Sequence, residues 1–371
     1  MGNWKNGELG DFVTLKRGFD LPQQKREDGQ VPIFSSSGIT GTHSTAMVKA
    51  PGVITGRYGT IGEVFYAAKD FWPLNTTLFV EDFHGNDAKF IYYFLKTLEW
   101  SKFTSASAVP GINRNTVHKE IVSLPDIETQ RRIASTLSMF DEKNKINTEI
   151  NDNLEQQAQS YFQELFVDNA DPEWAIGTIS DLGTVVGGST PSKAKPEYYT
   201  ESGIAWITPK DLSINKSKFV SHGENDITEL GLKNSSAAIM PEGTVLFSSR
   251  APIGYIAIAA GEVTTNQGFK SVVPKPGIGT PFVYFFLKNT LPVIEGMASG
   301  STFKEVSGST MKNVPAVIPD AETLAKFSDF CAPIFAQQRI LEEQNQSLAT
   351  LRDNLLPKLM SGEIDVSDVQ L

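Results

Sequence analysis

The chain of 371 residues lacks several features that whole classes of protein require. Cys331 is the single cysteine, so no disulfide can form within the chain and a reducing, cytoplasmic location is expected. The four histidines are scattered, which disfavours a zinc site. No apolar run approaches the ~20 residues that span a bilayer. The opening stretch MGNWKNGELGDF has no basic region followed by an apolar one, so we expect no secretion signal and no membrane role.

Common catalytic motifs are missing too. The chain has neither a GxxxxGK[ST] phosphate loop nor the Asn-Pro-Pro-aromatic tetrapeptide with which amino-methyltransferases hold a base. The glycines of GRYGTIG (56–62) precede a strand-like run rather than a helix, which indicates turns rather than dinucleotide binding. Pro125-Asp126 and Asp141-Glu142-Lys143 formally fit a nuclease pattern. They share one predicted helix, however, on which positions 141 and 143 point about 200° apart. We therefore expect no catalytic residue, metal or cofactor in this chain.

The net charge of −10 is unevenly distributed along the chain. Residues 126–171 contain 4 Lys and Arg against 10 Asp and Glu, and residues 320–371 contain 4 against 9. The longer segments are balanced, with 13 against 12 in residues 1–125 and 12 against 12 in residues 172–319. A balanced segment can still carry a basic face, so the acidic total does not exclude nucleic acid as a partner.

The sequence repeats itself. PDIET (125–129) returns as PDAET (319–323), FIYYFLK (90–96) returns as FVYFFLK (282–288), and Trp4 with Gly7 matches Trp174 with Gly177. The spacing of the matches grows from 170 to 194 residues, so the second half carries an insertion, mostly between 188 and 250. Matches in several blocks indicate two copies of one plan.

Each copy predicts a small α+β domain followed by a long helix. The runs GVITGRYG, EVFYAA, GTVLFSS and YIAIAA read as strands and turns, and AKFIYYFLKTLEW (88–100) and its counterpart at 281–291 read as helices. The predicted boundaries are 1–125 and 170–319 for two globular domains, 126–169 for a central helix, and 320–371 for a distal helix with a tail.

Both acidic segments show the heptad rhythm of a helix seam. The seam residues are Ile133, Leu137, Phe140, Leu154, Tyr161 and Leu165 in the first segment, and Phe327, Ile334, Leu341, Leu348, Leu355 and Leu359 in the second. Polar residues interrupt the first seam and are interpreted as fixing its register. Each segment begins with Pro-Asp, and Gly362 is the expected end of the second. A helix of ~40 residues is about 60 Å long, too long for one small domain to cover. We therefore expect an antiparallel coiled coil with a pseudo-twofold axis; packing of each helix on its own domain is the alternative.

Polar residues on Gly-rich loops are the candidate contacts to DNA, because they suit phosphate and base-edge hydrogen bonds. The candidates are Ser35, Ser36, Ser37, Thr40, Arg57, Arg114, Lys193, Thr208, Lys210, Ser248, Ser249, Arg250, Thr302 and Lys304. Arg57 and Arg250 occupy equivalent positions in the two halves. An arginine there can bind a phosphate or a guanine, or it can brace its loop through a carboxylate. Solvated turns are the alternative interpretation of these loops.

The whole chain resembles the specificity (S) subunit of type I restriction–modification enzymes. The alternation of domain and helix matches end to end, and five blocks carry the similarity. They are GRYGTIGEVFY (56–66) with the FWPLNTTLFV that follows, LPDIETQRRIASTL (124–137), GIAWITPKDL (203–212), TNQGFKSVV (265–273) and LRDNLLPKLMSGEI (351–364). The second helix departs from the family pattern, because PDAETLAKF lacks the Gln-plus-basic pair after the glutamate.

The resemblance implies that each domain is a target recognition domain that reads half of a bipartite site in double-stranded DNA. It also implies that the helices dock two methyltransferase subunits, which bind S-adenosylmethionine and methylate adenine at N6. ATP-driven translocation and cleavage would belong to restriction subunits. Because the two domains differ in their loops, the half-sites should differ in sequence. A scaffold or toxin-neutralising protein without a DNA role is an alternative, as is a methyltransferase with a degenerate site. The Gly/Ser/Arg loops argue against the first, and the missing cofactor motifs argue against the second.

Overall fold

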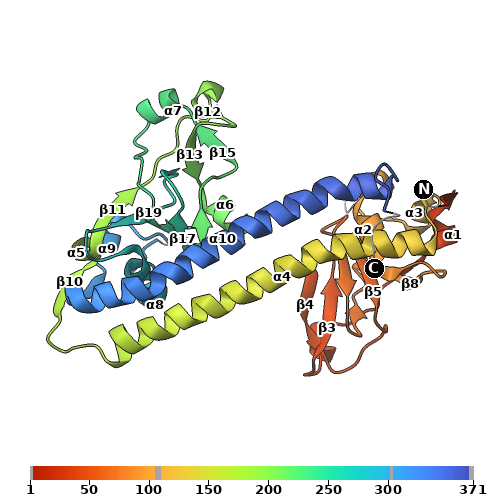
Figure 1. The fold of residues 1–371 in the computed structure, drawn as a ribbon, viewed down its shortest axis with the longest axis horizontal. Helices are drawn as coiled ribbons and strands as arrows, with labels where there is room; N and C mark the ends of the chain where they lie inside the picture. Colours follow the sequence, from red (N-terminus) through yellow and green to blue (C-terminus); the bar gives the residue numbers. More distant parts are fainter. Residues whose placement is uncertain (1–2, 105–109, 301–303, 367–371) are drawn as a thin grey trace. The chain divides into compact units, whose positions relative to one another are not determined.

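The computed structural model describes residues 3–104, 110–300 and 304–366. The chain divides into two compact units (Figure 1): unit 1 comprises Met1–Lys145 with Gln346–Leu371, and unit 2 comprises Ile146–Asn345. Two long helices, α4 (Ile127–Gln163) and α10 (Ala321–Met360), each contribute one stretch to unit 1 and another to unit 2.

Unit 1 is built on a four-stranded sheet in the order β2-β8-β5-β6, in which every pair is antiparallel. A second sheet, β4-β3-β7, contains the parallel pair β3–β7, and β1 pairs with β9. Besides the two long helices, the strands and α-helices of unit 1 are β1 (Lys5–Glu8), α1 (Leu9–Phe12), β2 (Thr14–Arg17), β3 (Val31–Ser35), β4 (Gly38–His43), β5 (Gly52–Gly56), β6 (Val64–Ala67), β7 (Trp72–Pro73), β8 (Thr77–Asp82), α2 (Ala88–Lys96), α3 (Arg114–His118) and β9 (Ile121–Leu124).

Unit 2 has a five-stranded sheet, β11-β19-β16-β17-β14, a four-stranded sheet, β12-β15-β13-β18, and the pair β10–β20. The elements are β10 (Ala175–Thr178), α5 (Ile179–Leu182), β11 (Gly183–Gly187), β12 (Tyr199–Thr200), β13 (Ile204–Ile207), α6 (Pro209–Ile214), β14 (Phe219–Val220), β15 (Asn225–Ile227), α7 (Glu229–Lys233), β16 (Val245–Ser249), β17 (Ile253–Ala259), β18 (Thr264–Thr265), β19 (Lys270–Pro274), α8 (Thr280–Gly296), α9 (Gly308–Lys312) and β20 (Pro315–Ile318).

The two units share one topology, which confirms the predicted repeat. The order β2-β8-β5-β6 in unit 1 corresponds to β11-β19-β16-β17 in unit 2, and the parallel pair β3–β7 corresponds to β13–β18. The extra residues of unit 2 lie between β13 and β16, where α6, β14, β15 and α7 replace the single strand β4 of unit 1. We call residues 208–244 the insertion.

Each unit buries a core that includes parts of both long helices. In unit 1, Ile133 and Leu137 of α4 and Leu356 and Leu359 of α10 belong to the same apolar cluster as α1, β2 and α2. In unit 2, Ala158 and Phe162 of α4, with Phe327, Cys331 and Ile334 of α10, belong to the cluster that includes α8 and the central sheet. Burial of these side chains, roughly 1.5–3 kcal/mol for each large one, ties the helices to both units.

The repeated pentapeptides cap the long helices. Asp126 Oδ1 accepts the Thr129 N–H at 3.0 Å at the start of α4, and Asp320 Oδ1 accepts the Thr323 N–H at 2.8 Å at the start of α10. Gln130 of the first helix is buried and donates to Asn86 Oδ1 at 2.7 Å. The equivalent position in α10 is Leu324, which joins the apolar core instead. The departure from the family pattern therefore replaces a buried polar contact by an apolar one and leaves the cap in place.

The twelve predicted seam residues are all buried or half-buried. Within unit 1, Arg352 of α10 donates to Asp141 of α4 at 2.6 Å. Within unit 2, Asn147 donates to Asn345 at 2.9 Å, and the rings of Tyr161 and Phe327 lie 6.0 Å apart. Residue numbers rise along α4 as those of its partners fall along α10, so the helices pair antiparallel in each unit. The coiled-coil geometry and the twofold axis stay predictions. Helix α10 ends at Met360, just before Gly362, whose φ is +75°.

Candidate nucleic-acid interface

A basic pocket of about 580 Å³ opens on unit 1 between the end of β2, the loop after β5 and the start of α3. Its lining includes Lys16 and Arg17 from β2, Arg57 after β5, and Arg114 at the first position of α3. Four cations from three segments therefore converge on one open surface. This is the kind of surface that attracts a phosphate backbone.

Local backbone contacts hold the Arg57 loop in place. The Arg57 N–H donates to the Thr76 carbonyl at 2.8 Å, and the Arg57 carbonyl accepts the Ile112 N–H at 3.0 Å. Gly111 permits this close approach, because a Cβ at that position would lie 2.1 Å from Tyr58 Cε1. The segment that leads to Arg114 is thus fixed against the loop that carries Arg57.

The four cations differ in how far they are already neutralised. Lys16 pairs with Glu81, and Arg17 lies 3.5 Å from Asp20, both at exposed positions where such pairs are weak. The Arg57 guanidinium stacks on the Tyr58 ring at 4.4 Å. Among the described residues, neither Arg57 nor Arg114 forms an ion pair. These two arginines therefore keep their charge available to an anion.

The equivalent surface of unit 2 carries its own carboxylate. Arg250 directly follows β16, and its Nη1 lies 3.5 Å from Glu305 Oε2. The expected equivalence of Arg57 and Arg250 is wrong by one residue, because Arg250 bridges to Glu305 as Tyr58 bridges to Gly111. The counterpart of Arg57 is Ser249, whose carbonyl accepts the Val306 N–H as the Arg57 carbonyl accepts the Ile112 N–H. Lys270 at the start of β19 also faces Glu305, at 3.8 Å. Burial lowers the pKa of Lys270, and Glu305 opposes that effect. Glu305 stands where unit 1 has Gly111, so the two units present different charge at matching places.

The β3–β4 turn lies next to the Arg57 loop. The Ser36 side chain packs close to Gly56 and Gly59. The Ser35 hydroxyl bonds to Ser37 at 3.1 Å and to the Gly38 carbonyl at 3.2 Å, which shapes the turn. The structure thus brings these serines beside Arg57, while the side chain of Thr40 is exposed further along β4.

The candidates of unit 2 do not form one surface. Ser248 and Ser249 are fully buried, and their hydroxyls donate to the Pro252 and Gly268 carbonyls at 2.8 and 3.1 Å. They brace β16, a central strand with both faces covered, and are not exposed to a ligand. Thr208 caps α6, with its hydroxyl 2.6 Å from Asp211 Oδ2.

The remaining candidates are lysines and one threonine. Lys210 pairs with Glu224 at 2.6 Å on an exposed surface. Lys193 and Lys304 are exposed and form no ion pair within the described part of the chain. Thr302 lies outside the described residues.

Sequence reasoning missed five residues on these two surfaces: Lys16, Arg17, Tyr58, Lys270 and Glu305. The stretch LKRG at 15–18 could have pointed to Lys16 and Arg17, because it ends at Gly18, one of the glycines that the repeat matches. No sequence signal pointed to Glu305, because its partner Arg250 is far away in sequence and only the fold brings the two residues together.

Metal-ligating side chains and long apolar helices can be assessed in residues 3–104, 110–300 and 304–366. These residues contain no group of three or more His, Cys, Asp or Glu side chains placed to hold a metal ion. None of their helices has both the length and the apolar character needed to cross a membrane. The carboxylates of the nuclease-like pattern are occupied elsewhere: Asp126 caps α4, and Asp141 accepts hydrogen bonds from Tyr93 and Arg352, each at 2.6 Å.

The chain repeats one α+β unit with polar surfaces built by loops, and comparison with known proteins identifies its family. The model of the type I restriction modification DNA specificity domain matches residues 1–156 and 172–351. The chain therefore belongs to this family and carries its domain twice. The domain is described by its role in DNA specificity, that is, in recognising DNA rather than in catalysis.

Named relatives agree with this assignment. The type I restriction enzyme MjaIX specificity subunit of Methanocaldococcus jannaschii is 39% identical over 194 residues, which is 50% of this chain but only 45% of the relative. The HindI specificity subunit of Haemophilus influenzae is 24% identical over 347 residues, covering 72% of this chain and 75% of the relative. The crystal structure of an S subunit from M. genitalium shares the fold, with a TM-score of 0.64, 19% identity and 96% coverage of both chains.

Proposed function

We propose that this chain is the DNA sequence-specificity subunit of a type I restriction–modification complex, and that each unit reads one half of a bipartite site in double-stranded DNA. The observation that carries the proposal is the double match of the DNA specificity domain, in two units that share one topology. Two copies of one DNA-reading scaffold in one chain favour two half-sites, one for each copy.

The target is expected to be asymmetric. In unit 1, Arg57 and Arg114 are without carboxylate partners among the described residues, and an arginine of this kind binds phosphate or a guanine edge. In unit 2, Glu305 faces both Arg250 and Lys270, and the insertion adds elements that unit 1 lacks. Surfaces that differ this much favour half-sites of different sequence.

The long helices are proposed to set the gap between the half-sites and to dock two adenine-N6 methyltransferase subunits. Helix α4 exposes Met139 and Ile150, and α10 exposes Leu351, although both helices bury their opposite faces. Ile146 of α4 and Ile340 of α10 are equivalent in the repeat and are 49% and 47% exposed. Two matching exposed apolar positions on the repeated helices support two copies of one partner.

The remaining components are proposed to come from partner subunits. S-adenosylmethionine would bind the methyltransferase subunits, and ATP would bind restriction subunits if these join the complex. A complex that methylates chromosomal DNA would work in the cytoplasm of its cell.

The test is a map of N6-methyladenine in the source organism, with and without the gene for this chain. The proposal expects one asymmetric, gapped motif to lose its methylation when the gene is deleted, and the neighbouring gene to encode an adenine methyltransferase. If every methylated motif persists although the chain and its methyltransferase are expressed, the proposal is wrong. A coiled-coil scaffold without a DNA role is then the better interpretation.

A further inference from the structure

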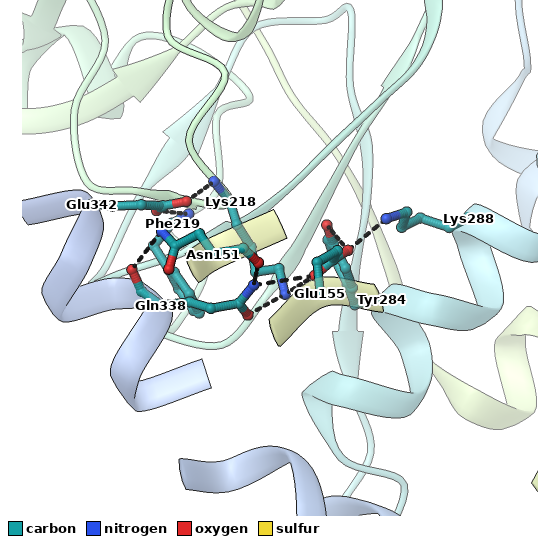
Figure 2. A network of polar contacts seen from close by, with 8 residues as sticks. All are labelled: Asn151, Glu155, Lys218, Phe219, Tyr284, Lys288, Gln338 and Glu342. Carbon is teal, nitrogen blue, oxygen red and sulfur yellow. Dashed lines mark hydrogen bonds and ion pairs between the residues drawn. The ribbon is translucent and has the colours of Figure 1, made fainter. Parts of the chain in front are cut away.

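A buried lysine of the insertion connects three helices of unit 2 (Figure 2). Lys218, just before β14, is 7% exposed, and its ammonium group donates to Gln338 Oε1 of α10 at 2.6 Å. The same group forms an ion pair with Glu155 of α4. It also lies 4.7 Å from the ring centre of Tyr284 on α8. One side chain of the insertion therefore contacts α4, α8 and α10.

Glu155 is the shared acceptor on α4. It accepts from Lys288 Nζ at 2.5 Å and from the Tyr284 hydroxyl at 3.1 Å, in addition to Lys218 (Figure 2). Burial alone would raise the pKa of Glu155, but the two lysines outweigh it and hold the pKa below its ordinary value. The carboxylate stays ionised, so the contact is charged on both sides.

A second carboxylate fixes the backbone on either side of the lysine side chain. Glu342 of α10 accepts the Lys218 N–H at 2.7 Å and the Phe219 N–H at 3.0 Å (Figure 2). Phe219 begins β14, which pairs with β17 of the central sheet. Helix α10 is thereby attached to the edge of that sheet, through the main chain as well as through a side chain.

The network also joins the two long helices to each other. Gln338 Nε2 of α10 donates to the Asn151 carbonyl of α4 at 3.1 Å, while Gln338 Oε1 accepts from Lys218. Sliding α10 by one residue would move its side chains by about 1.5 Å along the axis and turn them by about 100°. Such a shift would leave buried charges without partners, a strongly destabilising state. Only one register satisfies the whole network.

The described part of unit 1 has no residue equivalent to Lys218, because the insertion is absent there. Its helices are joined by Asp141, which accepts from Tyr93 of α2 and from Arg352 of α10, both at 2.6 Å. In unit 1 the contacts of Asp141 come from α2 and α10, which both units possess. In unit 2 the network includes Lys218, which belongs to the insertion.

We propose that Lys218 is a positioning residue: it fixes the register of α4 against α10 in unit 2 and thereby sets the gap between half-sites that the protein accepts. The inference rests on the proposed function, in which the helices set that gap. The insertion then contributes to spacing as well as to recognition.

The experiment uses the full chain assembled with its methyltransferase. Methyl transfer is measured on synthetic duplexes that carry the mapped half-sites at the native gap, one base pair shorter and one base pair longer. Variants are Lys218→Met, which fills the site without charge and leaves Glu155 paired with Lys288, and Lys216→Met, an exposed control in the same loop. For Lys218→Met, the ratio of native-gap to altered-gap rates should fall about tenfold, as expected when a buried charged hydrogen bond is lost. Lys216→Met should keep the wild-type ratio.

An unchanged ratio in Lys218→Met protein that folds and assembles as wild type does would overturn the inference. If that variant does not fold, Glu342→Gln decides, because it keeps the size of the side chain but weakens its hold on the two backbone N–H groups. An unchanged ratio in Glu342→Gln overturns the inference in the same way, and a reduced ratio supports it. Wild-type protein that methylates none of the bipartite duplexes would instead contradict the proposed function itself.

Discussion

Arg57 and Arg250 follow equivalent strands of the two units, yet only Arg250 faces a carboxylate, with Nη1 3.5 Å from Glu305 Oε2. Arg57 stacks on Tyr58 instead, at 4.4 Å. Arg57 thus offers a cation without a carboxylate partner on the described part of unit 1, whereas Arg250, which stands in the place of Tyr58, faces a carboxylate on unit 2. The carboxylate that faces Arg250 comes from Glu305, which stands where unit 1 has Gly111.

Replacing Arg57 should therefore weaken DNA binding more than replacing Arg250. For Arg57→Ala in the assembled complex we expect a loss of about 1–3 kcal/mol in binding free energy, with a smaller salt dependence if the contact is to a phosphate. Fluorescence anisotropy on a duplex with the mapped site, at several salt concentrations, measures both quantities. Lys69→Ala, an exposed change elsewhere on unit 1, is the control. Equal affinities for Arg57→Ala and wild type would remove Arg57 from the interface.

Removing the carboxylate of unit 2 should have the opposite effect. Glu305→Gln releases both Arg250 and Lys270 from their shared partner. We expect tighter binding to DNA of unrelated sequence, and a slope of log K against log salt that is steeper by about 1 for each additional phosphate that the protein neutralises. The same anisotropy titration on a duplex without the site checks this expectation. A salt slope equal to that of wild type would show that this surface does not reach DNA.

The caps of the long helices should contribute to stability through their side-chain oxygens. Asp126→Ala removes the acceptor of the Thr129 N–H and should cost about 1 kcal/mol of unfolding free energy. Asp126→Asn keeps the acceptor for the Thr129 N–H but loses the second oxygen, which accepts the Asn3 N–H at 3.0 Å, so it should cost less than Asp126→Ala. Asp320→Ala should also lower the unfolding free energy, because Asp320 accepts the Thr323 N–H in the same way. It further accepts a hydrogen bond from Trp174 Nε1 at 2.9 Å. Urea unfolding followed by circular dichroism measures the changes; an Asp126→Ala variant as stable as Asp126→Asn would exclude the cap.

His118 should make unit 1 less stable in mild acid. Its Nε2 accepts the Leu15 N–H at 2.8 Å, which requires the neutral ring. Burial, together with the nearby Arg114 and His84, lowers the pKa of His118 below its ordinary 6.5. The unfolded chain therefore binds the proton more readily, so this contribution to stability is complete above about pH 6.5 and declines as the pH falls below it.

The measurement for His118 is the unfolding temperature at pH 7.5 and at pH 5.5. The wild-type temperature should fall between these two conditions by more than that of His118→Gln, whose amide oxygen accepts a hydrogen bond but does not titrate. Equal changes in the two proteins would show that His118 is not the responsible group.

The repeat made much of the fold predictable. Matching pentapeptides located the starts of both long helices, and Asp126 and Asp320 cap them as the pattern indicated. The seam residues were predictable because helical periodicity is a local property of the sequence. The position of the insertion followed from the changing spacing of the matches.

Contacts between distant residues were not predictable in this way. Ser248 and Ser249 looked like loop residues beside Arg250, yet β16 is a central strand whose neighbours bury and satisfy both hydroxyls. Lys218 has no counterpart in unit 1, so the repeat gave no signal for it. Its role depends on Glu155 of α4 and Gln338 of α10, each more than 60 residues away in sequence.

The composition of unit 1 has a consequence for how the protein is made. Its apolar core needs Leu356 and Leu359, which the ribosome adds more than 200 residues after Ile133 and Leu137 of the same core. Unit 2 is a continuous stretch, so its core needs no residue beyond Asn345. A chain that stops before Leu356 would expose the apolar face of α4 to chaperones and proteases. Unit 1, although most of it is translated first, therefore completes its core only when the last turns of α10 are available.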